Sequence, residues 1–81
     1  MALRPRAKTL QVAFGLALRQ CREAQDLSQE ELGFRAEVHR TYISELERGL
    51  KSPSLGTLER LAVALEIRTS KLIEGAEALL K

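Results

Sequence analysis

The sequence has few of the residues that a metal site, a disulfide framework or an acid–base catalytic centre needs. Its 81 residues include one cysteine, one histidine, one tyrosine, two phenylalanines and no tryptophan. The single cysteine, Cys21, cannot form a disulfide within the chain, which fits a reducing cytoplasm. His39 has no ligand cluster and no second base or oriented nucleophile to work with. We therefore expect no cofactor, no metal and no enzymatic activity.

Long hydrophobic runs are also absent. No apolar stretch approaches the 18 residues of a membrane span, and the first residues, MALRPRAK, lack the apolar centre of a signal peptide. The chain is 44% apolar but only 4% aromatic, and its β-branched residues are few. These features predict an all-α fold with a core of leucine, alanine and isoleucine. The length predicts one domain.

The formal net charge of +2 is unevenly distributed. Residues 1–8 carry Arg4, Arg6 and Lys8 and no acid, whereas residues 9–81 contain ten basic and eleven acidic residues. Overall basicity is thus no argument that the folded part binds nucleic acid. We predict a basic arm over residues 1–8 and a single domain over residues 9–81. The arm either reaches a DNA phosphate or the minor groove, or is an ordinary disordered start.

The stretch from Gln29 to Arg48 is typical of two short helices joined by a tight corner. Ser28 is the expected N-cap of the first helix, and Glu31 completes an S-x-x-E capping box. Gly49 is expected to end the second helix in left-handed geometry. The inward-facing positions of the two helices are Leu32, Gly33, Ala36, Val38, Ile43 and Leu46.

The outer face of the second helix carries side chains suited to the major groove of DNA. They are Arg40, Thr41, Tyr42, Ser44, Glu45 and Arg48. Arginine forks onto guanine, threonine and serine donate or accept, and glutamate accepts from cytosine. A solvated helix face is the alternative interpretation. The small Gly33 and the apolar positions around it suit two helices that cross steeply, which favours DNA binding.

These residues resemble the helix-turn-helix domain of the Cro/C1 phage-repressor family. The resemblance is carried by LSQEEL (27–32), YISELERG (42–49), Pro53 and TLERLAVAL (57–65). It implies a compact five-helix, phage-repressor-like domain that binds DNA as a dimer. It also implies that Gln29 contacts the DNA backbone and that Arg22 and Glu47 form a structural ion pair. Glu37 departs from the family pattern, which has glycine at the corner, so we expect a strained or reshaped turn.

The expected DNA-binding residues lie on and around the second helix of this unit. Arg40, Thr41 and Glu45 are expected to contact bases. His39 is expected to contact a phosphate or a base edge, with simple helix capping as the alternative. The complete predicted set is Gln29, His39, Arg40, Thr41, Tyr42, Ser44, Glu45, Arg48, Lys51 and Ser52.

The flanking helices are expected to close the core. Thr9 should cap a helix that runs to about Ala24, and Ser54 should cap a fourth helix, on which Arg60 is expected to be solvated. A fifth helix should run from Thr69 or Ser70 to Leu80. The predicted core face of the first helix is Leu10, Ala13, Phe14, Ala17, Leu18 and Cys21. The predicted apolar stripe of the fourth is Leu55, Leu58, Leu61, Ala62 and Leu65.

The leucine-rich fifth helix predicts a homodimer interface. We expect it at Ile73, Ala76, Leu79 and Leu80, unless this helix only covers its own core. A two-fold dimer would hold two recognition helices ~34 Å apart and match an inverted-repeat operator in double-stranded DNA.

The short chain and its fifth helix resemble controller proteins of restriction–modification systems. These bind near their own promoter as dimers and switch between activation and repression. Activation would add RNA polymerase as a partner, with Glu30, Glu31 and Phe34 as contacts. Whether Phe34 is exposed or tucked against the domain is left open. A Cro-like repressor or an antitoxin autoregulator is an alternative, and a protein-interaction module on the same fold is an alternative from another class.

Overall fold

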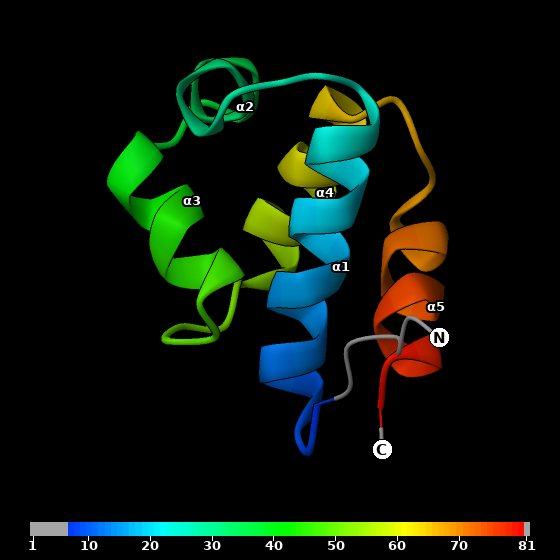
Figure 1. Cartoon of the computed structure of the whole chain (residues 1–81). Helices are drawn as coiled ribbons and strands as arrows, with labels where there is room; N and C mark the ends of the chain where they lie inside the picture. The colour runs from blue at the N-terminus through cyan, green and yellow to red at the C-terminus, as the bar shows by residue number, and fades with distance from the viewer. Residues whose placement is uncertain (1–6, 81) are drawn as a thin grey trace.

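The computed structural model describes residues 7–80, which form five helices (Figure 1). They are α1 (Leu10–Ala24), α2 (Gln29–Ala36), α3 (Arg40–Glu47), α4 (Leu55–Ala64) and α5 (Thr69–Ala78). Within residues 7–80 the only β-type pairing is an isolated bridge between Ala7 and Leu80. The predicted all-α, five-helix fold is confirmed. None of the described helices is long and apolar enough to cross a membrane.

Side-chain caps begin α1, α2 and α4, as predicted. The hydroxyl of Thr9 accepts from the N–H of Val12 at 3.2 Å, and that of Ser54 accepts from the N–H of Thr57 at 3.1 Å. Ser28 and Glu31 form both halves of the capping box at 2.9 Å. The backbone N–H of Ser28 lowers the pKa of the Glu31 carboxyl, because the hydrogen bond favours its charged form. These bonds satisfy N–H groups that a helix start leaves without partners.

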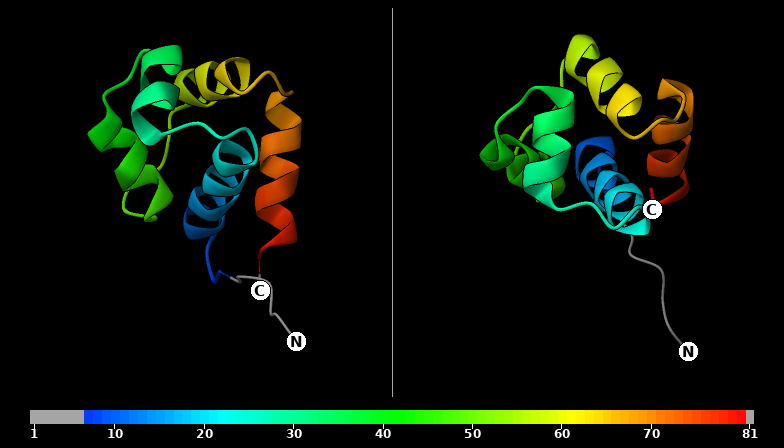
Figure 2. Two further views of the ribbon diagram at one scale, coloured as in Figure 1. Left: turned by 45° about the horizontal axis from the view of Figure 1, so that its top comes forward. Right: turned by 90° about the horizontal axis from the view of Figure 1, so that it is seen from above.

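α1 lies between the α2–α3 pair and α5 (Figure 2). It packs mainly on α5 and α3, while α2 also packs on α4. The backbones of α1 and α3 approach so closely at Gly15 that a side chain there would collide with the carbonyl oxygen of Leu46. The largest fully buried side chains are Leu18, Leu32, Ile43, Leu46, Leu61, Leu65 and Leu72.

The corner between α2 and α3 keeps left-handed geometry without glycine. Glu37 has φ of 59° and ψ of 41°, and its N–H bonds the carbonyl oxygens that end α2. This conformation costs a non-glycine residue roughly 1–2 kcal/mol. The close approach is made by Gly33 instead, where an added Cβ would lie 2.7 Å from the carbonyl oxygen of Val38. The turn is therefore strained, and it is not reshaped.

Two residues predicted in the core lie at the surface. Leu10 is 46% exposed and Leu55 is 84% exposed. Each is the first residue of its helix, α1 or α4. Helical periodicity places them on the apolar face but does not show that the core ends before the first turn. The predictions for Leu10 and Leu55 were wrong.

Two residues predicted at the dimer interface are buried within the chain. Ala76 is 0% exposed and Leu79 is 3% exposed, because α5 packs these side chains inward with Leu72. This placement contradicts the predicted interface at Ala76 and Leu79. Ile73 and Leu80 are half-buried and keep some surface.

The folded part begins before the predicted boundary at residue 9. Ala7 is buried, and its N–H donates to the carbonyl oxygen of Leu79 at 2.9 Å. The first described residue is thus joined to the residue that follows α5. Residues 1–6 of the predicted arm, which include Arg4 and Arg6, lie outside the described residues, whereas Lys8 is described and exposed.

Candidate nucleic-acid interface

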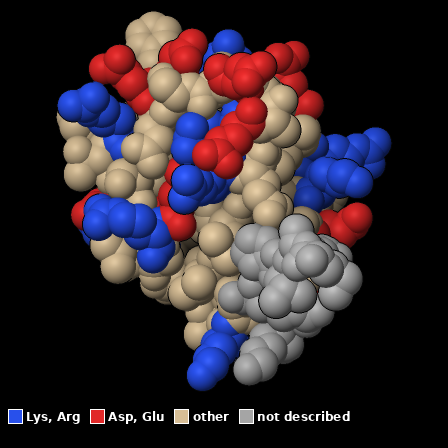
Figure 3. Space-filling model, in the orientation of Figure 1, with Lys and Arg blue, Asp and Glu red and all other residues tan. Residues whose placement is uncertain are grey.

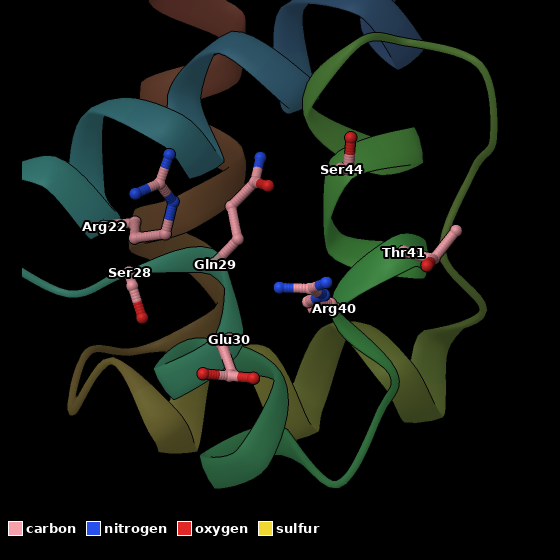
Figure 4. Close-up of a pocket in the computed structure, with 7 residues that line it drawn as sticks. All are labelled: Arg22, Ser28, Gln29, Glu30, Arg40, Thr41 and Ser44. Atoms are coloured by element: carbon pink, nitrogen blue, oxygen red, sulfur yellow. The ribbon is translucent and has the colours of Figure 1, made fainter.

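A groove of about 600 Å³ lies between α1, α2 and α3. Its side chains come from the last turn of α1, the start of α2 and the outer face of α3, and Figure 4 shows them around the same opening. The lining residues are Arg22, Ser28, Gln29, Glu30, Arg40, Thr41 and Ser44. Four of these were predicted DNA-binding residues, so the fold brings together groups from 29 to 44 on one surface.

The predicted ion pair between Arg22 and Glu47 is present beside this groove. Arg22 Nε donates to Glu47 Oε2 at 2.6 Å, and Nη2 donates to Oε1 at 2.9 Å. The side chains are only 12% and 4% exposed. The hydrogen bonds to Glu47 raise the pKa of Arg22. Arg22 also donates to the carbonyl oxygen of Leu27 at 2.8 Å, so this one arginine joins α1 to α3 and to the turn before α2.

Gln29 shares the same carboxylate. Its Nε2 donates to Glu47 Oε1 at 3.0 Å from the first turn of α2. The side chain is thereby held at the groove, half-buried, with its second amide proton still able to donate. The predicted contact of Gln29 with the DNA backbone stays a prediction.

His39 caps α3. Its Nδ1 accepts from the N–H of Thr41 at 3.0 Å, so the ring is protonated at Nε2 when neutral. Capping was the alternative to a DNA contact for this residue, and the structure has the cap. His39 is exposed, so its Nε2–H can still donate to a phosphate, and the predicted phosphate contact stays a prediction.

The outer face of α3 is partly engaged with its own neighbours. Arg40 and Thr41 are exposed on its first turn. Arg48, one turn after Ser44, donates to the hydroxyl of Ser44 at 3.2 Å. Glu45 pairs with Lys51, at 3.2 Å between Oε1 and Nζ. The sequence predicted the face correctly, but it did not predict these pairings.

Three structural side chains were missed by sequence analysis. Gln11 of α1 accepts from the hydroxyl of Ser52 at 2.8 Å and donates to the carbonyl oxygen of Gly49 at 2.8 Å. Gln11 therefore fixes the loop after α3, and the hydroxyl hydrogen of Ser52 is already used in this bond. Arg60, expected to be solvated, donates to the carbonyl oxygen of Ala36 at the end of α2, at 3.2 Å.

Gln25 is the third of these side chains. Its Nε2 donates to the carbonyl oxygen of Leu65 at 2.7 Å, which joins the end of α1 to the end of α4. Gln11, Arg60 and Gln25 all bond carbonyl groups 24 or more positions away in the chain. No local pattern in the sequence identifies such partners.

Charges of both signs cover the face in Figure 3. Acidic side chains gather toward the top of the view, where Figure 1 has α2, and basic ones lie among them and below. Among residues 7–80, no group of histidine, cysteine, aspartate or glutamate side chains is arranged to hold a metal ion. This face therefore has no field of one sign, and binding of a polyanion to it depends on individual side chains.

Comparison with known proteins gives matches over this same region. The Helix-turn-helix family matches residues 18–72. The control protein C.BamHI of Bacillus amyloliquefaciens is 38% identical over 66 residues, which cover 80% of this chain and 82% of that protein.

Two solved structures are similar in fold and sequence. The restriction–modification controller protein C.AhdI of Aeromonas hydrophila has a TM-score of 0.75 and 42% identity, covering 76% of this chain and 94% of that one. The biofilm regulator SinR, solved in complex with DNA, has a TM-score of 0.71 and 31% identity, covering 74% and 97%. The family match extends from α1 to α5 and includes the whole α2–α3 unit and its ion pair. The chain belongs to the helix-turn-helix family of the Cro/C1 type.

Proposed function

We propose that the protein is a sequence-specific, DNA-binding transcriptional regulator and works as the controller protein of a restriction–modification system in the cytoplasm. The observation that carries this proposal is the exposed first turn of α3, held against α1 and α2 by the Arg22–Glu47–Gln29 network. Its relatives C.BamHI and C.AhdI are named as control and controller proteins.

The proposed docking puts α3 into the major groove. Arg40 and Thr41 then meet base edges, while Gln29, at the start of α2, meets the phosphate backbone. The common groove that these residues line supports one joint contact with DNA. Tyr42 and Ser44 are half-buried and would contact bases or the DNA backbone at the edges of this interface.

We further propose that two copies bind an inverted repeat. Because Ala76 and Leu79 are internal, the supporting surface is a largely apolar hollow of about 200 Å³ beside Ile73. Leu10 is exposed at its edge, and Leu55, two residues after Pro53, is 84% exposed. An exposed apolar side chain beside an apolar hollow, such as Leu10, is typical of interaction surfaces. The residues that line the hollow are Leu10, Gln11, Phe14, Ser52, Pro53, Leu58 and Ile73.

Selection of bound sites from a random duplex pool at about physiological salt tests the function. The expected result is an enriched inverted repeat with half-sites about 10 bp apart or a multiple of it. A folded protein that enriches no sequence would contradict the proposal and favour the protein-interaction module.

Contact with RNA polymerase is the second part of the controller function. Phe34 on α2 is 86% exposed and lies beside Glu30, Glu31 and Arg35 along a shallow hollow. An apolar side chain among acidic ones suits a partner with a basic, partly apolar surface. We expect Phe34→Ala to reduce activated transcription in a purified system and to leave operator affinity unchanged. Unchanged activation would show that α2 makes no such contact, and the matched control is Val63→Ala on α4.

A further inference from the structure

Lys51 lies back over the outer face of α3 from the loop that follows it. Its Nζ is 3.2 Å from Glu45 Oε1 and 5.9 Å from the centroid of the Tyr42 ring. One lysine thus contacts two residues that are three positions apart on the predicted recognition helix. Glu45 follows Thr41 by four residues, so the two side chains share one helix face.

The carboxylate of Glu45 is only partly exposed. Its side chain is 26% exposed, against 54% for Lys51. Arg48 also lies on this face, but it bonds the side chain and the carbonyl oxygen of Ser44. Among residues 7–80, Lys51 is therefore the cation that neutralises Glu45, and Glu45 Oε2 has no hydrogen-bond partner there.

A carboxylate on this face conflicts with binding to DNA unless its charge is neutralised. An unpaired glutamate near phosphates is repelled, and the local field is strong where water is excluded. A neutralised glutamate with one free oxygen is a different group, because it can accept a hydrogen bond from a base. Cytosine offers its N4 amino group as a donor in the major groove.

We propose that Lys51 and Glu45 form one specificity-determining unit for cytosine. Lys51 neutralises and orients the carboxylate, and Glu45 Oε2 accepts from the cytosine N4 amino group. This proposal rests on the proposed function, in which α3 enters the major groove. It makes Lys51, which the sequence predicted as a DNA-binding residue, a positioning residue for Glu45.

The two roles of Lys51 differ in their dependence on Glu45. If Lys51 binds a phosphate, Lys51→Met weakens binding equally with or without Glu45, and it lowers the slope of log affinity against log salt by about 1. If Lys51 neutralises Glu45, Lys51→Met leaves a repelled carboxylate at the interface. Removing that carboxylate as well should then restore binding.

A double-mutant cycle on the selected operator tests this difference. The four proteins are wild type, Glu45→Gln, Lys51→Met and the double variant, each measured on the operator and on duplexes changed at one base pair at a time. We expect the double variant to bind more tightly than Lys51→Met by about threefold or more. We also expect Glu45→Met, which removes the acceptor oxygens, to lose about five- to a hundredfold discrimination for a cytosine at one position per half-site.

Three controls make the result specific. Lys51→Arg keeps the charge and should keep the cytosine preference. Lys71→Met removes the exposed pair with Glu74 on α5 and should change nothing. Melting curves should show every variant folded, since both side chains of the Glu45–Lys51 pair are at the surface.

Two outcomes would overturn the proposal. One is an equal loss from Lys51→Met in both backgrounds. The other is an unchanged base preference in Glu45→Met. Failure of the wild-type protein to bind any duplex is distinguishable from both, because it would reject the proposed function itself.

Discussion

At the scale of single residues, one buried carboxylate organises the candidate interface. Glu47 is 4% exposed in its side chain and accepts from Arg22 twice and from Gln29 once. A buried charge is tolerated only when its partners replace the lost water. The three elements that supply these groups are α1, α2 and α3, so the ion pair also fixes where the recognition helix lies.

Removal of Arg22 should therefore destabilise the fold strongly. Arg22→Ala leaves Glu47 buried without its main partner, which costs about 3–5 kcal/mol of unfolding free energy. Urea denaturation measures it. Arg19→Ala is the control, because it breaks an exposed pair with Glu23 and should cost at most about 1 kcal/mol. Equal effects of the two substitutions would contradict a structural role for the Arg22–Glu47 pair.

Arg40 is the residue at which specificity is most directly testable. Its side chain is exposed on the first turn of α3 and makes no hydrogen bond or ion pair within residues 7–80. If it forks onto a guanine, Arg40→Ala should cost about 1–3 kcal/mol on the operator and relax one base-pair preference. Competition binding against single-base variants measures this. An equal loss on every sequence would identify Arg40 as a phosphate contact instead.

At the scale of elements, helix packing holds the α2–α3 corner in a backbone conformation that a non-glycine residue disfavours. Glu37 adopts φ of 59°, a conformation that suits glycine, while the buried Gly33 supplies the space for the crossing. The glutamate in place of glycine predicted either strain or a changed turn. The strained turn persists because the contacts of both helices outweigh the local cost.

Glycine at the corner should consequently stabilise the domain. Glu37→Gly relieves the left-handed strain, and we expect a gain of roughly 1 kcal/mol in unfolding free energy. Thermal and urea denaturation both report it. Glu59→Gly is the matched control: Glu59 is exposed within α4, where glycine should cost about 1 kcal/mol. A loss of stability in Glu37→Gly would show that the Glu37 side chain stabilises the domain by more than its left-handed backbone costs.

At the scale of the whole molecule, the surface available to a second copy differs from the expected one. Leu10 and Leu55 should be buried in a dimer that uses the hollow beside Ile73. The double substitution Leu10→Ser and Leu55→Ser should raise the dimer dissociation constant by tenfold or more. Each leucine side chain removed should weaken the free energy of dimerisation by about 0.7 kcal/mol or more. Sedimentation velocity measures this.

The control for the dimer is Val63→Ser, toward the other end of α4, where the side chain is 71% exposed. It should leave association unchanged. A double variant that associates like the wild type would move the interface away from Leu10 and Leu55. In that case the half-buried Ile73 and Leu80 would be tested next.

The sequence by itself determined the features that depend on neighbouring residues. Side-chain N-caps, the capping box of α2 and the inward faces of α2 and α3 follow from interactions over three or four positions, and the structure has them where they were predicted. The end of α5 is an exception, because the predicted helix ran to Leu80 and α5 ends at Ala78. The outer face of α3 followed from the same periodicity. The Arg22–Glu47 pair spans 25 positions, and only the family resemblance indicated it.

The tertiary structure alone decided where the core ends and which polar groups meet. Leu55 lies at the surface and Leu79 lies in the core. Burial depends on whether another element lies opposite a residue, and helical periodicity does not specify this. Gln11, Arg60 and Gln25 found their partners for the same reason. Their long side chains reach whatever the packing of distant helices brings within hydrogen-bond distance.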